Sequence, residues 1–264
     1  MGACIAKRTI SPFRIEEHKE IFAELNLAQE EAKEILRSYD TLWGKGVQVV
    51  SKNTFVKTLI DRHMCDYKRM DLDRLYAFAS YHEAINERSW IRFVYNVCIL
   101  QKKELPRLLF KVYSDDDGQS VTIDTVITAS EKMVGKYQVH ISEWHETEQM
   151  KETTSLHRKV CHEITGGKYY FNQNEFNTYV DRHRVISMGL IILQRELRNL
   201  SGGIVMWDQI SRRRIVDLMD NMSDSQRMEL EKDRTARKNR ERKKAEDKKR
   251  RKQKDTLRKR LRHI

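Results

Sequence analysis

The chain has 264 residues and a formal net charge of +12, and 18 of its 51 basic residues, with 6 acids, lie between residues 231 and 264. The preceding 230 residues therefore hold 33 bases and 33 acids, so the basic character belongs to a tail. Apolar runs fall far short of the roughly 18 residues of a membrane span, an early Lys7 and Arg8 argue against a secretory signal, and four singly spaced cysteines favour free thiols in a reducing cytosol.

The first expected elements are an N-terminal arm, residues 1–14, and two helices. The first helix is expected over Ile15–Leu25. The second is expected over Gln29–Tyr39, because Ala32, Ile35, Leu36 and Tyr39 recur at helical spacing and form one apolar stripe. A glycine-containing turn and a β-branched run ending at Val50 follow, and Ser51 is expected to cap the next helix.

This unit of helix, polar turn, β-type residue and helix recurs along the chain. The later copies run over Leu72–Leu100, Leu105–Met133 and Ser155–Val185. In every copy the central apolar residue stands five positions before the apolar residue that is expected to open the exit helix. The four pairs are Val50 and Phe55, Ile85 and Trp90, Val121 and Val126, and Phe171 and Phe176.

A repeated offset of this kind indicates internal structural repeats. Helix–loop–helix units with a β-type residue at loop position 8 are typical of EF-hands, whose position 8 residues pair as a short antiparallel ribbon. We therefore expect an all-α fold of four such units, with one EF-hand pair over residues 15–104 and a second over residues 105–186. A generic helical bundle with a recurring hydrophobic pattern is the alternative.

The stretch from Tyr39 to Gly118 resembles the calaxin-like EF-hand proteins of ciliary and flagellar outer dynein arms, within the neuronal calcium sensor and calcineurin-B-like superfamily. The resemblance rests on Val49-Val50, Asn53-Thr54-Phe55, Trp90-Ile91 and the stretch from Lys103 to Gly118, and extends more weakly to Phe176. It implies an adaptor in the axoneme of a cilium or sperm flagellum, bound to a dynein-arm or docking component. Calcium sensing is also implied by the resemblance.

The loop residues contradict calcium sensing. Calcium requires oxygen ligands at loop positions 1, 3 and 5, glycine at position 6 and a bidentate glutamate at position 12. With the β-type residue at position 8, the third loop is Ser114–Thr125 and has only Asp116 as a matching ligand. Calcium is thus expected to be absent, or held weakly by the residues Ser114, Asp115, Asp116, Asp117 and Asp124.

The other loops are poorer still. The first loop, Trp43–Thr54, has no carboxylate, and the second, Phe78–Ser89, ends in serine. The fourth, Ile164–Glu175, keeps the glutamate at position 12 but has Ile, Gly and Lys at positions 1, 3 and 5. We expect no other cofactor.

Enzymatic chemistry is not indicated. The one histidine-rich stretch has irregular spacing and favours a solvated linker over a zinc site, which would need closely spaced ligand pairs; its members are His140, His145, His157, His162 and Cys161. The nucleophile-elbow, Walker-type and zinc-protease motifs are missing. We therefore expect a protein that is not an enzyme.

Both ends of the chain carry localisation signals. Gly2 and Cys4 are candidates for myristoylation and palmitoylation, although Ala6 replaces the usual Ser or Thr. The tail, residues 228–264, is expected to be a helical or disordered polyanion-binding arm. Its densest basic residues are Lys243, Lys244, Lys248, Lys249, Arg250, Arg251 and Lys252.

Between the fourth unit and the tail, residues 187–227 are expected to form a helical extension that packs on the body, with an exposed partner surface as the alternative. Three partners compete for the tail: acidic tubulin tails, nucleic acid and a nuclear import receptor. Three interpretations follow: an axonemal EF-hand adaptor in the cytoplasm, a nuclear or nucleic-acid-associated EF-hand-like protein, and a membrane-tethered relative that depends on Gly2 and Cys4.

Overall fold

The computed structural model describes residues 10–81, 84–114, 118–134 and 158–220. These residues are mostly helical, with one two-stranded ribbon, so the expected all-α class is confirmed. The chain divides into two units, residues 1–211 and 212–264. Within the second unit only residues 212–220 are described.

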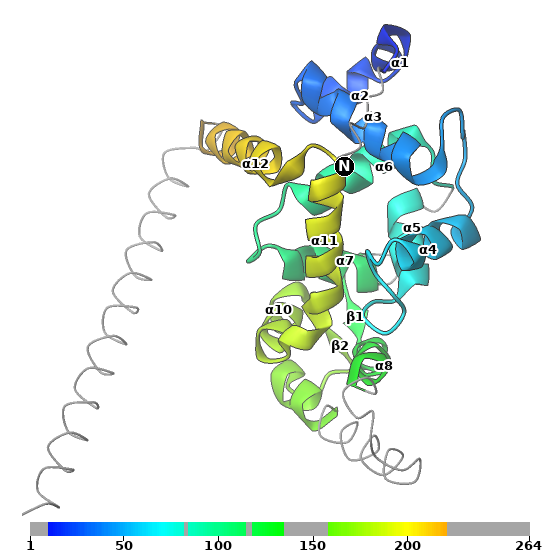
Figure 1. Cartoon of the computed structure of the whole chain (residues 1–264). Helices are drawn as coiled ribbons and strands as arrows, with labels where there is room; N and C mark the ends of the chain where they lie inside the picture. Colours follow the sequence, from blue (N-terminus) through cyan, green and yellow to red (C-terminus); the bar gives the residue numbers. More distant parts are fainter. Residues whose placement is uncertain (1–9, 82–83, 115–117, 135–157, 221–264) are drawn as a thin grey trace, which may run out of the picture. The chain divides into compact units, whose positions relative to one another are not determined.

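The helices follow the repeat predicted from the sequence (Figure 1). Two short helices come first, α1 over Pro12–Glu17 and α2 over Lys19–Glu24. The four units then contain α3 (Gln29–Trp43) with α4 (Lys52–Asp61), α5 (Leu72–Ser80) with α6 (Glu87–Cys98), α7 (Leu105–Tyr113) with α8 (Ile123–Val134), and a helical segment over residues 158–165 with α10 (Gln173–Arg182).

The single helix expected over Ile15–Leu25 is wrong, because the backbone leaves helical geometry at His18, with φ −109° and ψ 12°. The His18 ring instead makes a hydrogen bond to Glu87 of α6, with 2.9 Å between Nε2 and Oε2. Arg14 of α1 also reaches Glu87, from Nε to Oε2 at 2.8 Å. These tertiary contacts override the local helical tendency.

The exit helices begin three positions before the apolar residue that was expected to open them. For example, α4 begins at Lys52 and α6 at Glu87, before Phe55 and Trp90. The same difference recurs in α8 and α10. The expected apolar residue therefore identifies a buried position in the first turns of the helix and not the residue at which the helix begins.

The central residues pair in the way expected from the sequence. Val50 forms an isolated antiparallel bridge with Ile85. Val121 lies opposite Phe171 in an antiparallel ribbon formed by β1 (Val121–Thr122) and β2 (Tyr170–Phe171) (Figure 1). All four central residues are buried, with at most 1% of their surface exposed. Each bridge therefore joins two successive helix–loop–helix units.

Helix packing follows the same two-by-two arrangement. In the first pair of units, α3–α6, α3 packs on α6 and α4 packs on α5. In the second pair, which runs from α7 to α10, α7 packs on α10. In both pairs the first helix thus packs on the last helix. In the first pair the two helices between them, α4 and α5, also pack on each other.

Aromatic rings form the core of the first pair. Trp90 is fully buried and contacts Trp43 edge to face, with ring centroids 4.7 Å apart. Its indole N–H donates to Ser38 Oγ at 2.9 Å. Phe55 and Phe93 complete the cluster, with centroids 6.2 Å apart. Satisfying the indole N–H inside the core avoids the cost of an unpaired buried donor.

The chain after α10 forms a short 3₁₀ helix, η1 (Arg184–Ser187), and then α11 (Met188–Leu200) and α12 (Gly203–Asp220). The α11 helix packs against α6 and α7. Three of its four leucines, Leu190, Leu193 and Leu197, are fully buried. The expected packing of the extension onto the body is therefore confirmed for α11.

Polar side chains fix this packing at the C-terminal end of α6. Gln194 donates from Nε2 to the Val97 and Leu100 carbonyls at 2.7 and 2.9 Å. Arg198 donates from Nη2 to the Cys98 carbonyl at 2.7 Å, and Ser211 of α12 donates to the Ile99 carbonyl at 2.6 Å. Carbonyls at the end of a helix lack partners within that helix, so α11 and α12 cap α6.

Candidate functional site

The four loops are closed by one repeated hydrogen bond. In each, the amide of the residue at loop position 12 donates to the side-chain oxygen at position 9. The distances from nitrogen to oxygen are 3.3 Å for Thr54 and Ser51, 2.9 Å for Ser89 and Asn86, 3.3 Å for Thr125 and Thr122, and 3.0 Å for Glu175 and Asn172. Position 9 is thus the N-cap of every exit helix.

This cap explains the sequence offset. The central β-type residue is followed at once by the N-cap, and a buried apolar residue of the exit helix stands four positions after the N-cap in all four units. Ser51 was expected as such a cap, and its hydrogen bond confirms it. The other three caps were missed in the sequence, although Asn86, Thr122 and Asn172 are residue types that favour this position.

The third loop does not bring its expected ligands together. Ser114 donates from Oγ to the Lys111 carbonyl at 3.0 Å, back toward α7. Asp124 accepts from Arg158 Nη2 at 3.1 Å, in the next helical segment, and from the Tyr169 hydroxyl. The other expected ligands, Asp115, Asp116 and Asp117, lie outside the described residues.

A guanidinium group reaches the same loop from the first pair. Arg74 of α5 donates to the Tyr113 carbonyl at 2.7 Å and to Thr125 Oγ1 at 3.4 Å. Thr125 stands at position 12, where calcium loops place a bidentate glutamate. A protein cation therefore contacts the position that would hold a metal ligand. This contact could not be predicted from the sequence pattern, because Arg74 and Thr125 are 51 residues apart.

In the fourth loop the carboxylate at position 12 also accepts hydrogen bonds from the protein. Glu175 accepts from the Asn172 amide at 2.9 Å through Oε2 and from Lys168 Nζ at 3.1 Å through Oε1. Desolvation by burial raises the pKa of Glu175, but these two hydrogen bonds outweigh it and hold the pKa below its ordinary value. Lys168 stands at position 5, so its ammonium group contacts the carboxylate that a metal would need.

The described residues contain no group of three or more His, Cys, Asp or Glu side chains that could hold a metal ion. Of the histidine-rich stretch, His140, His145 and His157 lie outside the described residues. Cys161 lies within the fourth unit, in the helical segment over residues 158–165, where it is fully buried. Its burial raises the pKa of the thiol to about 12, so it is unreactive.

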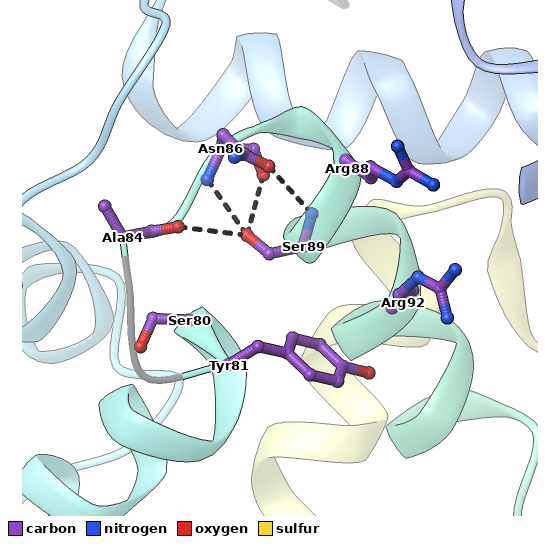
Figure 2. A pocket seen from close by; sticks show the side chains of 7 residues that line it. All are labelled: Ser80, Tyr81, Ala84, Asn86, Arg88, Ser89 and Arg92. Atoms are coloured by element: carbon purple, nitrogen blue, oxygen red, sulfur yellow. Dashed lines mark hydrogen bonds between the residues drawn. The ribbon is translucent and has the colours of Figure 1, made fainter.

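The second loop contains a pocket of about 230 Å³ (Figure 2). Its lining comes from the end of α5, the loop and the first turns of α6, and includes Tyr81, Asn86, Arg88 and Arg92. Figure 2 shows the Tyr81 ring and both arginine side chains extending to the same side of the pocket. Both charged side chains among the described lining residues are therefore arginines, at a place where a calcium loop carries carboxylates.

The remaining candidates lie where the structure gives no description. Gly2 and Cys4 fall in residues 1–9, and all seven basic tail residues fall in residues 221–264. Within the described residues, no helix is both long enough and apolar enough to cross a membrane. Protein-family models and curated proteins were both compared with the chain, and neither comparison produced a match.

Proposed function

We propose that this protein is a non-enzymatic EF-hand-fold adaptor whose hands keep their shape without calcium. The bridges Val50–Ile85 and Val121–Phe171 support this, because EF-hands occur in twos joined at loop position 8. The packing of α3 on α6 and of α4 on α5 is the arrangement that two such hands require.

One observation carries the proposal: the side chain of every position 12 residue is hydrogen-bonded within the protein, to its own N-cap residue and, for Glu175, also to Lys168. In a calcium loop this residue supplies two oxygens to the metal. Here Thr54, Ser89 and Thr125 are hydroxyl residues, and Glu175 bonds to Lys168 and its own N-cap. The exit helices are therefore held by hydrogen bonds that need no cation.

The choice of partner rests on the sequence resemblance. A calaxin-like adaptor would work in the axoneme of a cilium or sperm flagellum, bound to a dynein-arm or docking component, with its basic tail on acidic tubulin tails. The alternative is a nuclear or nucleic-acid-associated protein addressed by that tail. It is favoured by the excess of 18 bases over 6 acids in residues 231–264.

Calorimetric titration of the full chain with calcium, after treatment with a chelator, tests the metal-independent fold. We expect no binding heat at micromolar calcium and the same melting temperature with and without chelator. Micromolar binding that is lost in Asp116→Asn would contradict the proposal and assign the site to the third loop.

Imaging of a tagged chain in ciliated cells tests the partner. The axonemal proposal expects signal along the cilium that persists, although weaker, when residues 228–264 are deleted. Nuclear signal that disappears on this deletion would favour the alternative. A lysine-to-glutamine version of the tail keeps its length and serves as the charge control.

A further inference from the structure

The pocket of the second loop has walls that are already held in place. Arg92 donates to both carboxylate oxygens of Glu24, at 3.0 and 2.6 Å. The Tyr81 hydroxyl accepts from Asn96 Nδ2 at 3.1 Å, and the Tyr81 backbone adopts the left-handed conformation, with φ 53°. A pocket whose walls are fixed before binding loses little conformational freedom when a ligand enters.

Arg88 is the exception among these side chains. Arg88 lines the pocket and is exposed. Its side chain makes neither a hydrogen bond nor an ion pair with any other described residue. The Ser89 amide at the start of α6 is not available to a ligand, because it already donates to Asn86 Oδ1. The available cation is therefore an arginine side chain, whose planar donors match a carboxylate.

The size of the pocket limits what can enter. Sites for drug-sized ligands occupy about 300–1,000 Å³, and this pocket has about 230 Å³. It accommodates one side chain or a small group. The aromatic ring of Tyr81 beside the two arginines provides an apolar wall for the methylene groups of such a side chain.

We propose that this pocket binds a carboxylate side chain from an acidic peptide segment of a partner protein, with Arg88 as the main contact and Arg92 beside it. The inference rests on the proposed adaptor function and adds the chemistry of the segment that the adaptor recognises. A loop that carries carboxylates in calcium-binding EF-hands would thus present an arginine side chain to its partner.

The test is a titration of the isotopically labelled full chain with a hexaglutamate peptide at constant ionic strength, observed by the amide signals of residues 84–92. The tail also attracts polyanions, so a residue-specific signal is required. We expect saturable shifts at these amides, and an affinity about tenfold weaker in Arg88→Ala, the loss of one charge-assisted contact.

Arg107→Ala is the matched control, because Arg107 is an exposed arginine of α7 without a partner among the described residues. It is expected to leave the affinity unchanged. Absence of shifts at residues 84–92, or equal affinity in Arg88→Ala and the unaltered chain, would overturn the proposal. Shifts with inorganic phosphate but not with the peptide would overturn the assignment to a carboxylate. The calcium titration tests the proposed metal-independent fold, and its result does not depend on any of these three outcomes.

Discussion

The two pairs of helix–loop–helix units differ in the contacts that hold their loops together. The first pair joins its loops by a single bridge and fills the space beneath with an aromatic cluster around Trp90. The second pair has a two-residue ribbon and ion pairs at its loops, Arg158 with Asp124 and Lys168 with Glu175.

The comparison shows two kinds of contact beside the loops. The apolar burial that the Trp90 cluster provides in the first pair is insensitive to salt. Exposed ion pairs in the second pair contribute less and are screened by salt. The predictions below test this difference.

The largest effect is expected in the aromatic cluster. Trp90→Ala removes a fully buried ring and leaves Ser38 without its donor, so the free energy of unfolding is expected to fall by about 3–5 kcal/mol. Urea unfolding followed by circular dichroism measures it. Phe13→Ala is the control, because Phe13 is 78% exposed, and a change within about 0.5 kcal/mol is expected there.

Phe176→Ala extends the comparison to the second pair. Phe176 contacts Phe110 and Phe171, with centroids 5.5 and 6.3 Å away, but has no side-chain hydrogen bond to lose. Phe176→Ala is therefore expected to lower the free energy of unfolding by less than Trp90→Ala does. A larger loss for Phe176→Ala than for Trp90→Ala would reverse the assignment of the more strongly packed core to the first pair.

The sequence predicted the bridges because the caps impose a fixed spacing. An N-cap directly follows each of the central residues Val50, Ile85, Val121 and Phe171, and a buried apolar residue stands four positions after each cap. This local spacing was enough to predict the long-range pairing. The contacts of Arg74 with the third loop and of Lys168 with Glu175 follow no such local rule. The pocket of the second loop depends on where Arg88 and Tyr81 lie after folding, which periodicity does not specify.

The next prediction concerns the contact that holds α11 against the first pair. A methyl group on Gly189 would lie 2.3 Å from the Arg69 carbonyl oxygen, in the turn before α5. Gly189→Ala is expected to cost about 1–3 kcal/mol through overpacking. Without such a collision, alanine would stabilise a helix by about 1 kcal/mol relative to glycine. A lower free energy of unfolding in Gly189→Ala would therefore indicate the collision.

Met188→Ala controls for the effect of alanine in the same helix, since Met188 is 43% exposed. Chemical unfolding of both variants measures the difference. Equal stability of Gly189→Ala and the unaltered chain would mean that α11 can move away from the turn without loss, and that the first pair does not depend on it.

A smaller effect is expected where α1 contacts the first pair. Burial raises the pKa of Glu87, but hydrogen bonds from His18 and Arg14 lower it further, so the net pKa lies below its ordinary value. A lowered pKa stabilises the fold above the unfolded value of about 4.3, and this contribution disappears as the pH falls through the folded pKa.

Glu87→Gln is therefore expected to cost about 1–2 kcal/mol near pH 7, with the difference from the unaltered chain shrinking below about pH 4. Thermal unfolding across this pH range measures it. Glu16→Gln removes an exposed carboxylate from α1 and is the matched control. A difference that stays constant to pH 2 would show that the Glu87 charge is not what binds α1.

The smallest effect is expected at the fourth loop. Lys168 is half exposed, so Lys168→Met is expected to cost only about 0.5 kcal/mol, the usual size for such an ion pair. In 1 M NaCl, where the screening length is about 3 Å, the cost is expected to vanish, whereas the cost of Trp90→Ala persists. Lys57→Met, on an exposed position of α4, is the control. If salt changed both costs equally, the two pairs would not differ in how their loops are held, because screening acts on charge and leaves apolar burial in place.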